Sequence, residues 1–287
     1  MSVARPKAVS VAREGPGRIQ RTFARLEREG ARALIAYLTA GDPAPDRTLA
    51  LILALERGGA DILELGVPFS DPIADGPVIQ RASERALAAG TTVQTVLRLV
   101  RELRETSDLP VVVFSYLNPI LRYGFERFAD DAAEAGVDGA LLTDLNIEEA
   151  EGYVREMRVR GLDCVFLVTQ TTPRPRIAEI SRHSSGFVYL VARAGVTGER
   201  SSLSGEAIPL VGRTRAETSL PLALGFGLSR REHMEEVAPH AEGAVVGSAF
   251  MSVVEKHGGA PDLESRLEAL AADFKKGLKL RGAPEGR

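Results

Sequence analysis

Eight short apolar runs, rich in branched side chains, constrain the fold of this chain more than any other feature. Each run is followed by a turn of Gly, Asp, Pro or Ser and then by a longer amphipathic segment. Because the runs are apolar throughout rather than alternating, they are typical of parallel strands buried on both faces. The runs span residues 33–38, 60–66, 110–116, 138–144, 163–169, 186–192, 221–227 and 243–248.

Eight strand-plus-helix units favour a closed barrel. Parallel strands need long crossover connections, and the segments between the runs are long enough to be helices. A (β/α)8 barrel takes about 250 residues, so the chain holds one such domain with short tails. We therefore predict an α/β protein, a single-domain (β/α)8 TIM barrel. An open doubly wound sheet is the alternative, but no G-x-G-x-x-G motif follows the first run.

The domain limits follow from where periodicity begins and ends. Residues 1–18 have no periodic pattern and are predicted to be a flexible tail; residues 19–280 form the barrel, and 281–287 a C-terminal tail. Ile19, Phe23 and Leu26 recur at helical spacing, which predicts an extra N-terminal helix before the first strand. Two further helices are expected at 125–135 and 147–160, because each segment is followed by a glycine.

Composition excludes several classes of function. The net charge is −3, and no basic stripe interleaved with aromatics indicates nucleic-acid binding. No apolar stretch reaches the roughly 18 residues of a membrane span. A single cysteine, Cys164, predicts a reducing compartment, and we expect the cytoplasm; a transit segment fits the Arg-rich start less well because Glu14 and two prolines interrupt it.

Histidine and cysteine offer no metal site. The four histidines fall away from the predicted strand ends and lack metal-ligand spacing, so we expect them at the surface. Cys164 opens the fifth run and is expected to be an inert core thiol.

One carboxylate stands inside an apolar run. Glu64 lies near the end of the second run, and the working residues of such barrels lie at the carboxyl ends of strands and in the loops that follow. A lone buried carboxylate is unfavourable unless it is paired or protonated. Glu64 is therefore a candidate general acid/base with a raised pKa. A structural carboxylate bonded to backbone amides fits the position equally well.

The loop after this run carries Asp71 and Asp75. Asp-Pro and Asp-Gly are ordinary turn signals, so a turn role is the simpler interpretation of either aspartate alone. The length of the loop and its several apolar residues indicate instead that it folds over a ligand. Asp75 would then share acid and base roles with Glu64.

Glycine-bearing loops follow the sixth, seventh and eighth runs, at 193–198, 224–229 and 246–250. Barrels commonly bind phosphate at the last two of these positions, through free backbone N–H groups and the positive end of a helix dipole. A phosphorylated small molecule is the predicted ligand. The alternative is that the glycines serve only tight turns.

Several longer motifs occur in a fixed order: YLTAGDP (37–43), ELGVPFSDPIADGP (64–77), YLNPI (116–120), AGVTG (194–198) and GFG (225–227). Together these motifs closely resemble the tryptophan synthase α-subunit family, and the likeness covers nearly all of the chain after the tail. The run from Glu64 to Pro77 is the most specific of them.

The resemblance implies a lyase of tryptophan biosynthesis that cleaves indole-3-glycerol phosphate to indole and glyceraldehyde 3-phosphate in a retro-aldol sense. It implies that Glu64 is the acid/base that transfers protons at the ring carbon and at the side-chain hydroxyl. It also implies that Asp75 accepts a hydrogen bond from the ring N–H, and that Tyr189 has a supporting role near the reacting centre. The substrate-binding residues it implies are Tyr37, Ile79, Tyr116, Thr197, Gly198, Phe226, Gly227, Gly247 and Ser248.

The resemblance also implies a partner and no cofactor or metal in this chain. Pyridoxal phosphate is expected only in the tryptophan synthase β subunit, which would receive indole within an α2β2 heterotetramer. The loops around Asp71 and at 194–198 would close in response to the partner and exclude water.

A few positions depart from the family pattern: Thr143 and Asn146, where Pro-Asp-Leu-Pro is usual, Gln170, where Pro is usual, and Ala192, where Ser is frequent. These changes leave both carboxylates in place and bear on partner coupling more than on the chemistry. Three alternatives therefore stay open: a stand-alone indole-releasing lyase, a catalytically silent barrel that only activates a partner, and another phosphosugar isomerase or synthase on the same barrel.

Overall fold

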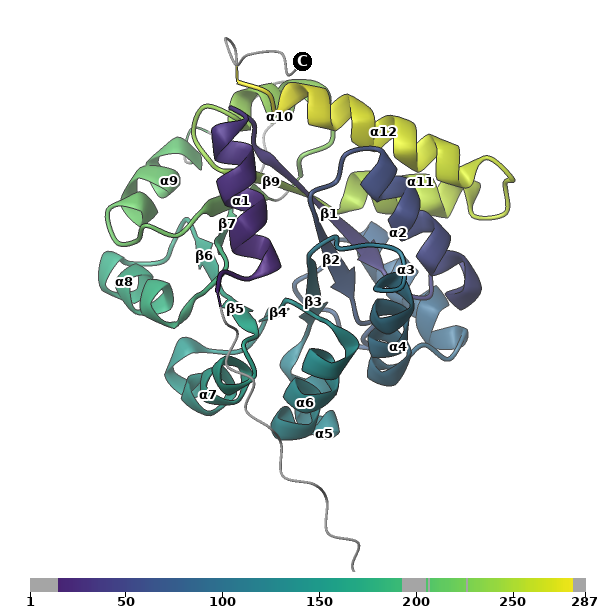
Figure 1. Cartoon of the computed structure of the whole chain (residues 1–287), viewed down its shortest axis with the longest axis horizontal. Helices are drawn as coiled ribbons and strands as arrows, with labels where there is room; N and C mark the ends of the chain where they lie inside the picture. Colours follow the sequence, from purple (N-terminus) through teal and green to yellow (C-terminus); the bar gives the residue numbers. More distant parts are fainter. Residues whose placement is uncertain (1–14, 193–204, 206, 226, 281–287) are drawn as a thin grey trace, which may run out of the picture.

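A single parallel sheet forms the centre of the computed structural model, which describes residues 15–192, 205, 207–225 and 227–280 (Figure 1). The sheet order is β5-β4-β3-β2-β1-β9-β8-β7-β6. The strands are β1 (Ala33–Thr39), β2 (Ile62–Gly66), β3 (Val111–Ser115), β4 (Gly139–Leu142), β5 (Asp163–Val165), β6 (Leu167–Thr169), β7 (Val188–Val191), β8 (Leu222–Gly225) and β9 (Gly243–Val246). All the predicted runs are strands, and the barrel class is confirmed.

The fifth run differs from the prediction because it forms two short strands, β5 and β6, separated by Phe166. Cys164 pairs with Ala140 of β4, whereas Leu167 pairs with Tyr189 of β7. The Phe166 carbonyl also accepts the Tyr189 N–H at 3.1 Å. The chain therefore changes neighbours within this run, and this change brings the two ends of the sheet together into a barrel.

Helices surround the strands (Figure 1). They are α1 (Arg18–Arg28), α2 (Thr48–Arg57), α3 (Pro77–Ala88), α4 (Val93–Leu103), α5 (Leu117–Tyr123), α6 (Phe125–Ala135), α7 (Glu151–Val159), α8 (Arg174–His183), α9 (Ala207–Arg215), α10 (Arg231–Val237), α11 (Ser248–His257) and α12 (Leu263–Gly277), with 3-10 turns η1 (Pro45–Arg47) and η2 (Ile147–Glu149). The helix predicted at 125–135 is α6. The one predicted at 147–160 is divided into η2 and α7. The tail limits at 18 and 280 stay a prediction.

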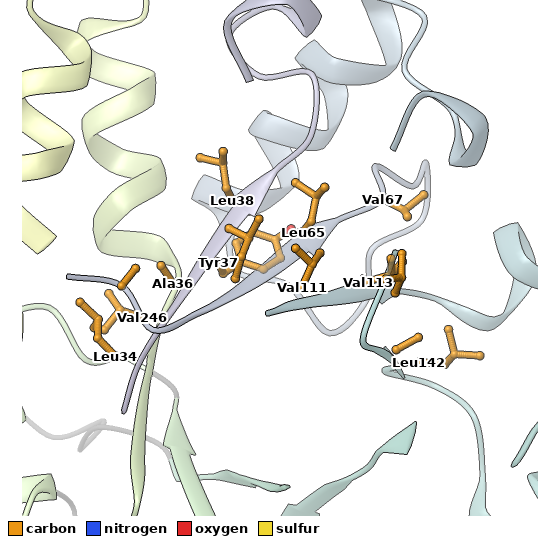
Figure 2. Packing of buried hydrophobic residues seen from close by; sticks show 14 of the residues in the cluster. Leu34, Ala36, Tyr37, Leu38, Leu65, Val67, Val111, Val113, Leu142 and Val246 are labelled. Carbon is orange, nitrogen blue, oxygen red and sulfur yellow. The ribbon is translucent and has the colours of Figure 1, made fainter. Parts of the chain in front are cut away.

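Two apolar cores follow from the period of two along each strand. In β1, Leu34 and Leu38 belong to the core between strands and helices, which Figure 2 shows from close by. Ala33 and Ile35 face the second core, inside the barrel. Every residue of β1 is buried, as expected for a strand covered on both faces.

Helix α1 closes the barrel at the end where the strands begin. Its residues Ile19, Phe23 and Leu26 join the inner core, and the Phe23 ring lies 6.0 Å from the ring of Phe187, centroid to centroid. The extra N-terminal helix predicted from their spacing is thus confirmed. It supplies the apolar side chains that seal this end from water.

Acidic residues stabilise the same end of the barrel. Three of them precede a strand, and each accepts a backbone N–H from the neighbouring strand. The bonds run from Leu34 to Asp61 (2.9 Å), from Val111 to Asp138 (3.0 Å) and from Leu222 to Glu242 (2.8 Å). Basic side chains pair with each acid, among them Arg25 with Asp61 at 3.2 Å and Arg18 with Asp138 at 3.3 Å. Because both arginines belong to α1, the ion pairs hold this helix in place.

None of the helices within the described ranges combines the length and apolar character that a membrane span requires.

Candidate active site

A cavity of about 410 Å³ opens at the carboxyl ends of the strands. Its floor comes from inward-facing residues of β1, β2, β3, β6, β7 and β9, and its rim comes from the loop that contains Asp75 and from the start of α11. The opposite end of the barrel is sealed by α1, so the catalytic end of the fold is the open one. The lining is mostly apolar, with a few polar groups, which is typical of a small-molecule site.

Glu64 lies on the floor of this cavity with its side chain almost completely removed from solvent. Its exposed fraction is 1%, and among the described residues its Oε1 has no hydrogen-bond partner. Burial raises the pKa of the carboxyl to about 8. The structural alternative requires the carboxylate to accept bonds from backbone amides, and Oε1 accepts none within the described structure. A protonated carboxyl at neutral pH is able to donate a proton to a ligand.

Asp75 lies on the rim and is held by Tyr116, which follows β3. The Tyr116 hydroxyl donates to Asp75 Oδ2 at 3.1 Å and accepts the Ala74 N–H at 2.9 Å. The Tyr116 ring also packs on Phe69, with centroids 5.2 Å apart. Burial raises the pKa of Asp75 to about 6, although the Tyr116 hydrogen bond acts in the opposite direction. The loop is therefore anchored at Tyr116 and presents an acceptor carboxylate to the cavity.

Two tyrosines flank the carboxylates, and each has its space provided by a glycine. A Cβ at Gly66 would lie 2.3 Å from the Tyr37 hydroxyl, and one at Gly225 would lie 2.4 Å from the Tyr189 hydroxyl. Both rings are buried, and burial together with the two nearby carboxylates raises the pKa of each phenol. Both tyrosines therefore stay neutral and serve as hydrogen-bonding and packing groups.

The start of α11 forms the far side of the cavity. Gly247 is the N-cap residue of this ten-residue helix, and Ser248 is its first residue. Both line the cavity together with Gly227, whose φ of +83° favours glycine. The first N–H groups of a helix have no partners within it, and the helix dipole makes them suitable for an anion. A phosphate group fits this end of the cavity.

The profile of the family described as "Tryptophan synthase alpha chain" matches residues 23–279. The chain belongs to this family. The tryptophan synthase alpha chain of Solibacter usitatus is 56% identical over 264 residues, which cover 92% of this chain and 99% of that protein. The alpha chain of Geotalea uraniireducens is 46% identical over 265 residues, with the same coverage of both.

Solved structures agree with the sequence comparison. The structure of tryptophan synthase subunit alpha from Legionella pneumophila is similar with a TM-score of 0.85 and 38% identity, covering 92% of this chain and 99% of that one. A tryptophan synthase structure from M. tuberculosis has a TM-score of 0.84 and 36% identity, covering 93% and 100%. Both similarities span the whole barrel, so this alpha chain shares its architecture with the family.

The structure brings most of the predicted site residues of this alpha chain together. Those that line the cavity are Tyr37, Glu64, Asp75, Ile79, Tyr189, Gly227, Gly247 and Ser248. Tyr116 lies behind Asp75 rather than among the lining residues. Thr197, Gly198 and Phe226 lie outside the described residues.

Sequence reasoning did not find several lining residues: Phe114, Thr143, Leu167, Thr169, Val191, Leu228 and Val245. Most lie within one residue of the carboxyl end of a strand. The rule that such barrels work at the carboxyl ends of strands points to these positions, but their side chains have no acid, base or glycine character to mark them.

The histidines and the cysteine take no part in this cavity. His233 is buried, 8% exposed, and its Nδ1 accepts the Ser229 N–H at 3.1 Å, so the expectation that it lies at the surface is wrong. It caps the backbone at the start of α10. Cys164 is fully buried, and burial raises its pKa to about 12, as expected of a core thiol. Over the described part of the chain, no three His, Cys, Asp or Glu side chains are grouped to hold a metal ion.

Proposed function

We propose that this alpha chain cleaves indole-3-glycerol phosphate to indole and glyceraldehyde 3-phosphate through the acid and base chemistry of Glu64. The observation that carries the proposal is the buried carboxyl of Glu64, unpartnered at Oε1, in a cavity that also contains Asp75 and the start of α11. Membership of the tryptophan synthase alpha chain family supports the substrate and the reaction.

The first step is protonation of the indole ring at the carbon that bears the glycerol side chain. Glu64, protonated at neutral pH because burial raises its pKa to about 8, donates this proton. The ring becomes a positively charged indolenine, and the Asp75 carboxylate accepts a hydrogen bond from the ring N–H. Its negative charge stabilises the positive charge that develops there.

The second step breaks the bond between the ring carbon and the side chain. The Glu64 carboxylate left by the first step removes the proton of the adjacent side-chain hydroxyl, the oxygen forms an aldehyde, and the electron pair of the broken bond returns to the ring. Glu64 regains its proton, so the reaction consumes no water and needs no external acid. The tyrosines Tyr37 and Tyr189 pack beside the ring in this arrangement.

The substrate's phosphate would bind at Gly247, Ser248 and Gly227, with Thr197, Gly198 and Phe226 completing the site on the loops. Ile79 and Tyr37 would form the apolar wall around the indole. None of these steps requires a metal or organic cofactor in this chain. The lone buried thiol fits a reducing compartment, so we place the reaction in the cytoplasm.

The partner in the proposed α2β2 complex is the tryptophan synthase β subunit, which would hold pyridoxal phosphate and receive indole. Ile73, in the Asp75 loop, is 85% exposed, and Leu121 on α5 is 56% exposed. Ile73 precedes the cavity-lining Ala74, and Leu121 lies on the helix that follows β3, so both belong to segments at the carboxyl end of the barrel. An apolar surface at this position supports docking of a partner that takes up the product.

An indole-release assay tests the proposal. The Glu64→Gln variant keeps the shape of the side chain but cannot transfer protons, so its kcat should fall at least about 100-fold. Glu268→Gln on α12, outside the cavity, should keep wild-type turnover. Wild-type protein that releases no indole with a β subunit present, or a Glu64→Gln variant as active as the wild type, contradicts the proposal.

The same assay separates the alternatives. Addition of the β subunit should raise the turnover of indole-3-glycerol phosphate, and Ile73→Asp should weaken co-elution of the two chains in gel filtration. Equal turnover with and without the partner indicates a stand-alone lyase. Activation of the partner with zero lyase turnover indicates a silent barrel.

A further inference from the structure

An ion-pair network behind the cavity joins the turn after β1 to helices α3 and α11. We propose that Arg81, Arg85, Asp42 and Glu255 form a positioning device that fixes α3 against α11, and so holds Asp75 in register with the phosphate end of the cavity. The proposal rests on the proposed function and adds residues that do not touch the substrate.

The inner half of the network is a bidentate pair between a buried carboxylate and a half-buried arginine. Asp42, in the turn after β1, is fully buried, and Arg85 of α3 donates to both of its oxygens, with Nε to Oδ1 at 2.7 Å and Nη2 to Oδ2 at 2.9 Å. Two parallel N–H···O bonds fix the orientation as well as the distance of the guanidinium. Arg85 therefore ties the last turn of α3 to the turn after β1.

The outer half connects α3 to α11 through Glu255. Arg81 donates to both oxygens of Glu255, at 2.6 and 2.9 Å, and Arg85 reaches Oε1 at 3.3 Å. The hydrogen bond from Arg81 is the main reason that the pKa of Glu255 is lowered to about 2. Glu255 thus stays ionised at neutral pH and bridges two arginines that lie one helical turn apart.

Both helices held by this network begin at the cavity. Helix α3 starts directly after the loop that carries Asp75, and α11 starts at Ser248. The two also touch at their cavity ends, because a Cβ placed on Gly247 would lie 3.5 Å from Cδ1 of Ile79. Contacts at both places leave α3 little freedom to slide or rotate against α11.

The turn after β1 is seated on the other end of α11. A Cβ placed on Gly258, just past α11, would lie 2.9 Å from Cβ of Pro43, which follows Asp42. The end of β1, α3 and α11 are therefore packed as one unit. Without the contacts between Arg81 and Glu255, the Asp75 loop and the phosphate end of the cavity would no longer be held at a fixed distance and angle. Each of these two parts would keep its own structure.

This difference predicts a distinctive kinetic result. A ligand that binds only the phosphate end uses the start of α11 and the glycine loops but not Asp75, whereas the reaction needs Asp75 and the phosphate end at the same time. Weakening the network should therefore lower kcat, because a small misplacement of catalytic groups has a large effect on rate. Binding of a phosphate-bearing fragment should change little.

The experiment uses full-length Arg81→Ala and Glu255→Gln, measured for turnover of indole-3-glycerol phosphate and for inhibition by glycerol 3-phosphate. We expect kcat to fall about 10-fold in each variant while the inhibition constant stays within about two-fold. Arg81→Lys, which keeps the charge but not the bidentate geometry, should recover part of the loss. Arg85 is left unchanged because its removal would strand the buried Asp42 carboxylate and endanger folding.

A matched control separates positioning from stability. Arg57 of α2 also joins two helices, through a 2.8 Å ion pair with Glu268 of α12, but neither residue lines the cavity. Arg57→Ala should lose about as much thermal stability as Arg81→Ala does, but its kcat should equal that of the wild type. Wild-type kcat in Arg81→Ala and Glu255→Gln, or an equal kcat loss in Arg57→Ala, overturns the positioning role. Inactive wild-type protein would instead contradict the proposed function itself.

Discussion

Two buried carboxylates of this chain show that partners, rather than burial alone, decide what an acidic residue does. Asp138 is fully buried, and it accepts bonds from Arg18, Arg104 and the Val111 N–H. Glu64 is equally inaccessible but has no partner at Oε1 within the described structure. The first arrangement stabilises a charge and serves the fold. The second disfavours the charge and leaves a proton available for chemistry.

Glu64 should make the stability of the protein depend on pH. Its pKa is about 8 in the folded state against an ordinary value of 4.5. Between these values the folded state binds a proton that the unfolded state has lost, so the free energy of unfolding falls as pH rises through this window. Glu64→Gln should therefore be more stable than wild type at pH 9, by on the order of 5 kcal/mol, and about equal at pH 4. Urea unfolding at both pH values measures the difference.

Asp138→Asn is the control for this prediction. It breaks a buried ion-pair cluster and should lower the free energy of unfolding by roughly 3–5 kcal/mol at pH 9, where Glu64→Gln should raise it. A Glu64→Gln variant that is no more stable than the wild type at pH 9 would show that the Glu64 carboxyl is ionised at little cost in the folded state.

At the scale of elements, the two ends of the barrel have separate tasks. Helix α1 packs Phe23 into the inner core at one end, whereas the cavity occupies the other. The acid pairs before β2, β4 and β9 also lie at the α1 end. Damage there should weaken the fold without changing the chemistry.

Phe23→Ala tests this separation. The ring is 7% exposed and packs on Phe187, so its removal should lower the free energy of unfolding by about 3 kcal/mol. At a temperature where the variant is still folded, its kcat should stay within about two-fold of the wild type. A large kcat loss in folded protein would contradict the independence of the two ends.

Much of this architecture could be predicted from the sequence, because the signals are local. Apolar runs predict strands buried on both faces, and Gly136, with φ of +85°, ends α6 where the pattern predicted. The division of the fifth run at Phe166 could not be predicted, because it depends on which neighbours each half meets when the barrel closes.

The residues of the candidate site also fall into two groups, those that a local sequence pattern predicts and those that it does not. Glu64 can be predicted from the sequence because a carboxylate in an apolar strand is a local anomaly. The Tyr116 bond to Asp75 and the Arg81 bond to Glu255 join residues distant in sequence, 41 and 174 positions apart, and no local pattern marks such pairs. The apolar floor residues, such as Phe114, look like any other core residue in the sequence.

At the scale of the whole molecule, the packed barrel has one sealed end and one open end, and the open end contains two carboxylates of different acidity. The pKa of Asp75 is raised to about 6 and that of Glu64 to about 8. Neutral pH lies between these values, so Asp75 is ionised while Glu64 keeps its proton. In the proposed reaction, Asp75 would accept a hydrogen bond from the ring N–H and Glu64 would donate its proton. Environments that separate the pKa values of two neighbouring groups in this way assign the acid and base roles.

The pH dependence of kcat/KM for indole-3-glycerol phosphate tests this assignment most directly, because it reports the ionisation of the free enzyme. Activity should rise as Asp75 ionises near pH 6 and fall as Glu64 loses its proton near pH 8, which gives a bell-shaped profile. Asp75→Asn should remove the acidic limb from the residual activity. A wild-type kcat/KM that still increases above pH 9 would contradict the account, because Glu64 would then act as a carboxylate and not as the initial acid.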